Sequence, residues 1–404
     1  MNKPELLAPA GDLECLETAL HFGADAVYLG GPKLQLRAAG VGFTMERLAT
    51  AVETAHRMGK KVYVTVNCYA YNSEIPEIAP YARELQAIGV DAVIVSDIGV
   101  IAEIKRAVPE LPVHVSTQAN CQNYASAMVY RDLGASRVVL AREMSLSQIA
   151  ELRAKVPEDL ELEAFVHGAM CMSYSGRCMI SAYLAGRSGN RGECAQPCRW
   201  QYALMEETRP GEYFPVHEDG EGMTILSSRD LCAIRFLDQL QDAGVSSFKI
   251  EGRMKSPYYV ATVTNAYRQV MDALARGETP DTDAAMAELS AVSHRDFTRG
   301  FYFGELQHET AAGPGYRQDC VFAGVVKDYD AAEGRMVFEQ RNRVYTGNEV
   351  EILSPGVPVR RMVMGEMTDK NGEATQDART PAAHYGAAVP FAVQPGDILR
   401  MRKA

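Results

Sequence analysis

The feature that most constrains the fold of this chain is a repeated rhythm, in which a short apolar, β-branched run is followed by a helix-like segment. Strands that alternate with helices form parallel βαβ units, and eight units over about 250 residues are typical of a (β/α)₈ barrel. An open doubly wound sheet is the alternative, but no G-x-G-x-x-G follows the first run. The eight runs are Glu5–Pro9, Ala26–Leu29, Lys61–Asn67, Ala92–Asp97, Val113–Gln118, Arg137–Ala141, Leu160–His167 and Ser247–Glu251.

The rest of the chain divides around this barrel. Glycines that precede the next strand predict helix C-caps at Gly23, Gly59, Gly89, Gly134 and Gly244. The last barrel helix is expected over Pro257–Arg276, so that the barrel occupies residues 1–280 with a glycine-rich, cysteine-rich insert at about 168–222. Residues 281–319 are expected to form a connector. Short, evenly spaced β-like runs then predict a small β-barrel domain over 320–404.

Composition limits the classes of function. None of the 404 residues lie in an apolar stretch long enough to span a bilayer, so we expect no membrane association. The first residues, MNKPELLAPAGD, lack the apolar region of a secretory signal, and we expect a cytoplasmic protein. A net charge of −11 argues against general DNA coating. It does not exclude RNA, because local basic patches decide binding.

Four of the nine cysteines crowd between Cys171 and Cys198, which in a reducing compartment indicates metal binding or redox chemistry. Iron–sulfur clusters are held by cysteine thiolates, whereas structural zinc prefers tight C-x₂₋₄-C pairs. Cys171 and Cys178 form a C-x₆-C pair, and Cys194 and Cys198 a C-x₃-C pair. The spacing alone leaves a cluster, zinc and simple buried thiols equally open. Outside this segment we expect core residues at Cys15, Cys68, Cys121 and Cys320.

Polar residues at the carboxyl ends of barrel strands are the candidates for chemistry, since active sites of such barrels lie on that face. Catalytic roles are predicted for His167, Lys249, Glu251 and Arg253, and substrate binding for Asn67, Gln118, Asn120, Arg142, Glu143 and Arg177. Tyr69 and Tyr71 are candidates for stacking on a base. Further basic residues of the predicted mouth, which would favour an anionic ligand as a group, are Arg187, Arg191, Arg199, Arg229 and Lys255.

One segment of the insert carries a long motif, E-x-F-x-x-G-A-M-C-x-x-x-x-G-x-C-x-x-S. This motif resembles the signature of the U32 peptidase family, the collagenase-like proteases. The opening ELLAPAGDLE and the later FKIEGRMKSPYYVA resemble the same family, and the resemblance extends over the whole chain. The matching motif positions are Glu163, Phe165, Gly168, Cys171, Gly176, Cys178 and Ser181.

The resemblance implies oxygen-independent hydroxylation, with a [4Fe–4S] cluster on four cysteines. Size and the single tail domain favour the branch that converts the tRNA wobble uridine to 5-hydroxyuridine, with prephenate as a small dicarboxylate co-substrate. It also implies a homo- or hetero-oligomer with a family paralogue. The implied cluster ligands are Cys171, Cys178, Cys194 and Cys232, with Cys198 as the alternative to Cys194.

Other functions remain open at this point. Proteolysis is the alternative that the family name suggests, but the chain has neither H-E-x-x-H nor G-x-S-x-G. Another aromatic substrate, such as an rRNA base or a quinone precursor, is a further alternative that the resemblance implies. A non-enzymatic reading is an RNA-binding partner with a structural metal, docking through residues 320–404. A cluster with an open iron position would bind an oxygen donor, whereas a four-cysteine cluster would pass electrons.

Overall fold

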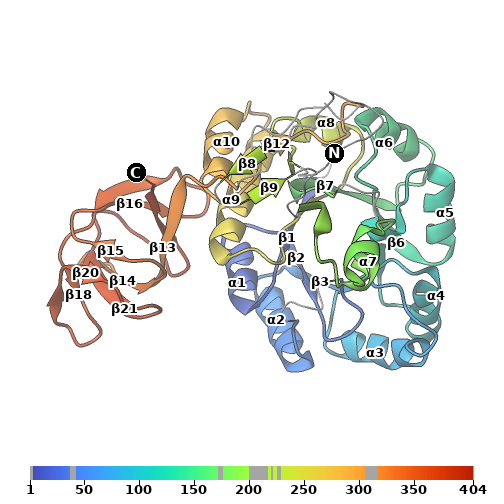
Figure 1. The fold of residues 1–404 in the computed structure, drawn as a ribbon, viewed down its shortest axis with the longest axis horizontal. Coiled ribbons are helices and arrows are strands. Elements are labelled where there is room, and N and C mark those ends of the chain that lie inside the picture. The colour runs from blue at the N-terminus through green and yellow to red at the C-terminus, as the bar shows by residue number, and fades with distance from the viewer. Residues whose placement is uncertain are drawn as a thin grey trace. The chain divides into compact units, whose positions relative to one another are not determined.

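The computed structural model confirms a (β/α)₈ barrel and an antiparallel C-terminal sheet (Figure 1). It describes residues 3–36, 42–171, 176–199, 217–219, 222–224, 229–304 and 316–403. Much of the predicted insert, including 172–175, 200–216 and 220–221, lies outside these ranges, as does the side chain of Arg199. No helix in the described ranges is long and apolar enough to cross a membrane.

Eight parallel strands close the barrel, because β11 pairs with both β1 and β7. Each strand corresponds to one of the runs predicted from the sequence, with ends that differ by a few residues. Every strand has a buried interior, as expected for a sheet covered on both faces. The strands are β1 (Glu5–Pro9), β2 (Ala26–Gly30), β3 (Lys61–Val66), β4 (Ala92–Val95), β5 (Val113–Val115), β6 (Ala135–Val139), β7 (Glu161–Ala169) and β11 (Ser247–Ile250).

Helices follow the strands, and several are capped at their ends. Thr44, Asp97 and Ser145 cap their helices by accepting backbone N–H bonds. The five predicted C-cap glycines all have positive φ, between 67° and 94°. The helices are α1 (Leu13–His21), α2 (Met45–Arg57), α3 (Ile75–Ala87), α4 (Ile98–Ala107), α5 (Tyr124–Asp132), α6 (Leu146–Arg153) and α8 (Leu237–Asp242).

The insert after β7 contains more regular structure than the sequence indicated. The insert contains a short helix α7 (Ile180–Ala185) and 3₁₀ turns at Gly189–Arg191 and Pro197–Arg199, the second of which includes Cys198. The strand β8 (His217–Asp219) pairs with β9 (Gly222–Thr224). The strand β10 (Asp230–Cys232) then runs antiparallel to the end of β7 and parallel to β12 (Phe297–Thr298). The sequence analysis did not predict these short strands, because three-residue strands carry no readable periodicity.

The chain forms two compact units, of which the first holds the barrel and comprises Met1–Leu16, Asp25–Met254 and Arg295–Tyr316. The second comprises Glu17–Ala24, Lys255–His294 and Arg317–Ala404. It contains α9 (Pro257–Ala275), which confirms the predicted last helix, and α10 (Thr282–Ser290).

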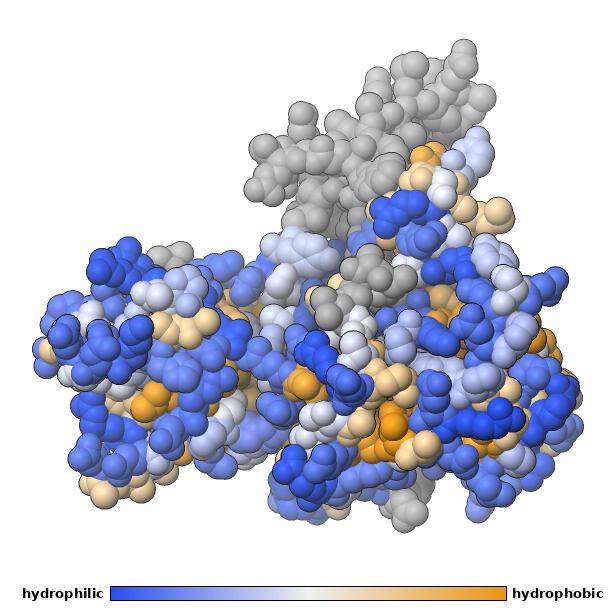
Figure 2. Space-filling view, turned by 90° about the horizontal axis from the view of Figure 1, so that it is seen from below, coloured by the Kyte–Doolittle hydropathy of each residue, from blue (hydrophilic) through white to orange (hydrophobic). Residues whose placement is uncertain are grey.

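The sheet of the second unit surrounds its own apolar core, which includes Met336, Phe338 and Ile352. Its central strands are long and antiparallel, as β13 pairs with both β14 and β22. The face of the molecule in Figure 2 is mostly hydrophilic, with apolar side chains in small groups. The strands in sheet order are β17 (Arg360–Val363), β16 (Glu349–Leu353), β22 (Ile398–Arg402), β13 (Cys320–Asp330), β14 (Arg335–Gln340), β21 (His384–Ala388), β18 (Met367–Thr368) and β19 (Ala374–Thr375).

Candidate functional site

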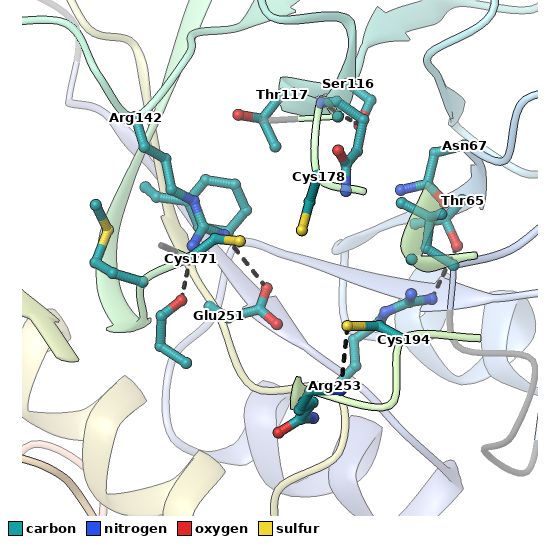
Figure 3. Close-up of a pocket in the computed structure, with 18 of the residues that line it drawn as sticks. Thr65, Asn67, Ser116, Thr117, Arg142, Cys171, Cys178, Cys194, Glu251 and Arg253 are labelled. Carbon is teal, nitrogen blue, oxygen red and sulfur yellow. Dashed lines mark hydrogen bonds and ion pairs between the residues drawn. The ribbon is translucent and has the colours of Figure 1, made fainter. Parts of the chain in front are cut away.

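A cavity of about 210 Å³ opens at the carboxyl ends of the barrel strands. Its walls come from the ends of β3, β5, β7 and β11 and from the cysteine-bearing insert (Figure 3). This is the face on which barrel enzymes carry their active sites. The predicted site residues that line it are Asn67, Gln118, Arg142, Cys171, Cys178, Cys194, Cys198, Lys249, Glu251 and Arg253.

The cysteines of the insert meet in this cavity. Cys171 is exposed, and Cys178, Cys194 and Cys198 are partly exposed. Figure 3 shows the side chains of Cys171, Cys178 and Cys194 around one common space. The backbone N–H of Gln196 lies 3.4 Å from the Cys194 sulfur and donates to it. Hydrogen bonds of this kind tune the sulfurs of iron–sulfur clusters.

The donor set of the cavity suits a metal centre held by cysteine thiolates. The side chains of Cys171, Cys178 and Cys194 face one common space, and thiolates are ligands of iron–sulfur clusters and of structural zinc. In the part of the chain that the structure describes, no three His, Cys, Asp or Glu side chains converge closely enough to hold a single metal ion.

Glycines allow the insert to approach the barrel. Gly176 has a φ of +71°, and a Cβ there would lie 2.1 Å from the carbonyl oxygen of Gln118. A Cβ on Gly189 would contact the Cys194 side chain at 3.5 Å. The glycine between Cys171 and Cys178 is therefore required both by its backbone conformation and by close packing.

Lys249 lies on the floor of the cavity, 4% exposed, and is paired with a buried carboxylate. Its Nζ lies 2.8 Å from Oε1 of Glu163, which is fully buried. Burial lowers the pKa of Lys249, and the charge of Glu163 opposes that shift. Burial alone would raise the pKa of Glu163, but Lys249 and Arg137 outweigh it and hold that pKa below its ordinary value.

Two arginines of the cavity wall are held by polar contacts (Figure 3). The Nη1 of Arg142 donates to the Ala169 carbonyl at 2.7 Å, its Nη2 lies 3.7 Å from Glu251, and its guanidinium lies 3.8 Å from the ring centroid of Phe165. Arg253 donates to the Thr65 hydroxyl at 2.9 Å. Both guanidiniums are thus fixed at a wall where a carboxylate or phosphate would find bidentate donors.

Two amide oxygens point to a ligand. The Oδ1 of Asn67 and the Oε1 of Gln118 are buried and accept no hydrogen bond from any residue that the structure describes. Both residues line the cavity. Buried polar atoms in proteins are nearly always satisfied, so unsatisfied acceptors in a cavity wall favour a bound donor.

The structure does not place the remaining predicted residues in the cavity wall. His167 is 1% exposed, with its ring centroid 5.6 Å from that of Phe297. Cys232 is buried in β10, opposite His167 in the ladder. Asn120 ends the 3₁₀ turn Thr117–Ala119 in a left-handed conformation and accepts from Gln122. Glu143, which is half-buried, and Arg177, which is exposed, also lie outside the lining.

Beside the cavity, Tyr71 in the loop after β3 packs against Arg191 of the insert. The guanidinium carbon of Arg191 lies 3.8 Å from the ring centroid of Tyr71, and Arg191 is ion-paired with Glu74 at 2.9 Å. Tyr71 is nevertheless 61% exposed. Tyr69 is different, since its hydroxyl donates to the Gln118 carbonyl at 2.8 Å. Of the two tyrosines, Tyr71 is therefore the one that can stack on a ligand.

The remaining predicted basic residues play mixed roles. Lys255 donates to the Ser293 carbonyl at 3.3 Å within the second unit. Arg229 is half-buried. Arg177 and Arg187 are exposed and have no ion pair within the described ranges. These last two present positive charge on the surface of the insert.

Sequence reasoning missed several residues of the site. Glu163 was named only as a motif position, and its partner Arg137 was not predicted to belong to the site. Tyr28, Thr65 and Phe165 also line the cavity. Their signal was the period-2 alternation along each strand, because alternate residues face the barrel interior.

The four cysteines predicted to be core residues are buried, with at most 5% exposure. Burial raises the pKa of Cys15 to about 12, and those of Cys68 and Cys121 to about 11. Burial also raises the pKa of Cys320. These thiols are protonated at neutral pH and are therefore poor metal ligands.

The chain was compared with known proteins. Residues 11–312 match peptidase family U32, and residues 318–400 match the peptidase family U32 C-terminal domain. The chain is 36% identical to tRNA hydroxylation protein P1 of Bacillus subtilis, over 100% of this chain and 96% of that protein. It is 36% identical to tRNA hydroxylation protein P of Escherichia coli (93% and 91%) and 33% identical to a collagenase of Porphyromonas gingivalis (90% and 90%). Matches over nearly its whole length establish that the chain belongs to peptidase family U32.

Proposed function

We propose that this chain is an iron–sulfur-dependent tRNA hydroxylase that converts the wobble uridine to 5-hydroxyuridine, with prephenate as co-substrate. The observation that carries the proposal is the convergence of Cys171, Cys178 and Cys194 on one cavity that also presents fixed arginines. Near full-length similarity to two proteins named for tRNA hydroxylation supports the choice of reaction.

Cys171, Cys178 and Cys194 would hold the cluster, with Cys198 or Cys232 as the fourth thiolate. Cys198 lines the cavity and Cys232 does not, although it lies on the neighbouring strand β10. When bound, the cluster would supply electron transfer or, with an open iron position, a Lewis acid.

The protein's own residues would bind and orient the substrates. Arg142 and Arg253 would hold the carboxylates of a dicarboxylate such as prephenate, because their guanidiniums are fixed and face the cavity. Asn67 and Gln118 would accept hydrogen bonds from the ligand through their unsatisfied oxygens. Lys249 would place a positive charge beneath the reacting ring, where it would stabilise negative charge that develops there.

RNA would be held at the rim of the cavity. Tyr71 offers an exposed ring with Arg191 over it, which suits stacking on an unpaired base. Arg177 and Arg187 would contact phosphates. A net charge of −11 makes such local patches necessary for RNA binding.

Nucleoside analysis tests this proposal. A strain that lacks the gene should lose 5-hydroxyuridine from its tRNA, and the wild-type gene should restore it. The Cys171→Ala gene should not restore it, whereas Cys15→Ala, which changes a buried thiol outside the cavity, should. Unchanged tRNA in the deletion strain would refute the reaction proposed here.

A peptidase is the second candidate, favoured by the 33% identity with a protein named collagenase. The cavity offers thiols but no histidine in its lining within the described ranges. A cysteine protease needs a base beside its thiol. Digestion of denatured collagen by the purified wild-type protein, abolished in Cys171→Ala, would favour this candidate.

A further inference from the structure

The interior of the barrel carries a row of buried charges where such barrels usually carry apolar layers. On one side of the interior, Leu7, Tyr28 and Ile94 belong to one apolar and aromatic cluster. On the side of β6, β7 and β11, three charged residues pack together and are at most 4% exposed, namely Arg137, Glu163 and Lys249. Branched apolar residues normally fill these layers. Buried ion pairs add little stability relative to apolar packing, so this row calls for a different role.

The contacts run in one direction, from the amino ends of the strands toward the cavity. Arg137 is ion-paired with Glu5 at 2.6 Å and with Glu161 at 2.7 Å. Its Nη1 also lies 3.0 Å from Oε2 of Glu163. The other carboxylate oxygen of Glu163, Oε1, accepts from Lys249 at 2.8 Å.

We infer that Glu163, itself fixed by Arg137, is the positioning residue that holds the Lys249 ammonium at the floor of the cavity. The Ser247 hydroxyl lies between the two carboxylates, 3.2 Å from Oε2 of Glu163 and 3.1 Å from Oε1 of Glu5. The Lys249 ammonium also lies 4.5 Å from the ring centroid of Tyr28. The inference rests on these contacts and does not depend on which substrate the cavity takes.

The described groups around Lys249 act on its pKa with opposite signs. Burial lowers the pKa of Lys249, and the carboxylate of Glu163 is the largest opposing influence. Glu251 acts in the same sense as Glu163, and Arg137 in the opposite sense. His114 is neutral because burial lowers its pKa, and the Tyr28 hydroxyl donates to the Ile250 carbonyl. Removing the charge of Glu163 should therefore let Lys249 lose its proton at a lower pH.

The test measures acetylation of Lys249 by acetic anhydride over a pH series, resolved by peptide mass spectrometry on the full-length protein. Only the neutral amine reacts, so the rate reports its neutral fraction. In Glu163→Gln the rate at a given pH should rise at least about tenfold, which corresponds to about one pKa unit. Glu161→Gln is the matched control. It also removes a carboxylate from Arg137, but Glu161 is 48% exposed and has no contact with Lys249, so the rate should stay near that of the wild type.

An unchanged rate in Glu163→Gln, or equal rises in both variants, would overturn the inference. If Glu163→Gln does not fold, Glu163→Asp keeps the charge but shortens the side chain, and labelling should still rise severalfold. A wild-type rate in that variant would also overturn it. Measuring tRNA hydroxylation by the same variants presupposes the proposed function. If the wild-type protein lacks that activity, the proposed function is refuted, and the labelling result alone decides the role of Glu163.

Discussion

Arg191 and Glu74 form a bidentate ion pair, with N–O distances of 2.9 and 3.0 Å. Arg191 belongs to the insert, three residues before Cys194, and Glu74 precedes α3 of the barrel. The hydrogen bonds from Arg191 lower the pKa of Glu74, and a hydrogen bond from the Tyr71 backbone N–H adds to this effect. The ion pair therefore fastens the segment that carries Cys194 to the barrel.

Replacing Arg191 should loosen that segment. In Arg191→Ala we expect faster loss of iron from the anaerobically purified protein, measured as bleaching of the visible spectrum in the presence of a chelator. Arg187→Ala is the control, because Arg187 is an exposed arginine of the same insert with no ion pair in the described ranges. Equal rates in the two variants would contradict a fastening role.

Gly176 should tolerate no side chain. In Gly176→Ala the new methyl group would overlap the Gln118 carbonyl in addition to straining the backbone. Gly186 has a similar φ of +64° but open space around it, so Gly186→Ala isolates the backbone strain. Strain alone costs about 1–3 kcal/mol. Chemical denaturation should show a larger loss of unfolding free energy for Gly176→Ala, and equal losses would refute the packing argument.

RNA affinity should depend on Tyr71. Loss of a stacked base in Tyr71→Ala should weaken binding of an anticodon stem-loop by about 1–3 kcal/mol. Tyr345→Ala is the matched control, since Tyr345 of the second unit is 46% exposed and its ring centroid lies 4.7 Å from the guanidinium carbon of Arg343. Fluorescence anisotropy measures both. A larger effect at Tyr345 would instead support docking through the C-terminal domain.

The buried thiols give a pH dependence. The folded pKa values of Cys15 and Cys121, about 12 and 11, lie above the ordinary value of a thiol. Their contribution to stability is therefore complete below about pH 8.5 and is lost as pH rises toward those values. The free energy of unfolding should fall between about pH 9 and 11, and less steeply in Cys121→Ala.

The same burial predicts an order of thiol reactivity. At pH 8, iodoacetamide should modify the exposed Cys171 of metal-free protein before it modifies Cys15 or Cys121.

In the second unit, Arg400 should matter more than Arg402. Arg400 is fully buried and ion-paired with Glu288 of α10 and Glu351 of β16, both at 2.8 Å. Arg400→Ala leaves these carboxylates without their buried partner and should cost about 3–5 kcal/mol. Arg402 also contacts Glu351, but its side chain is 54% exposed, so Arg402→Ala should cost less than about 1 kcal/mol. Thermal unfolding distinguishes the two.

The barrel could be predicted because each strand and its C-cap glycine are local signals. The position of polar residues at the carboxyl ends of strands then identified part of the cavity lining, including Asn67, Arg142 and Lys249. The partner of Lys249 could not be predicted, since it depends on the register between β7 and β11, where Phe165 lies opposite Lys249. The strand β10 was missed because three residues form it only through pairing with β7. The cofactor, and the choice between Cys194 and Cys198, rested on resemblance and stay predictions.

The proposed function depends on the cysteines of the cavity holding an iron–sulfur cluster. Iron and acid-labile sulfide should be measured, with a visible spectrum, on protein purified without oxygen. We expect about four iron and four sulfide per chain, lost in Cys171→Ala and Cys178→Ala and retained in Cys15→Ala. Zinc in place of iron, or full iron content in Cys171→Ala, would contradict it.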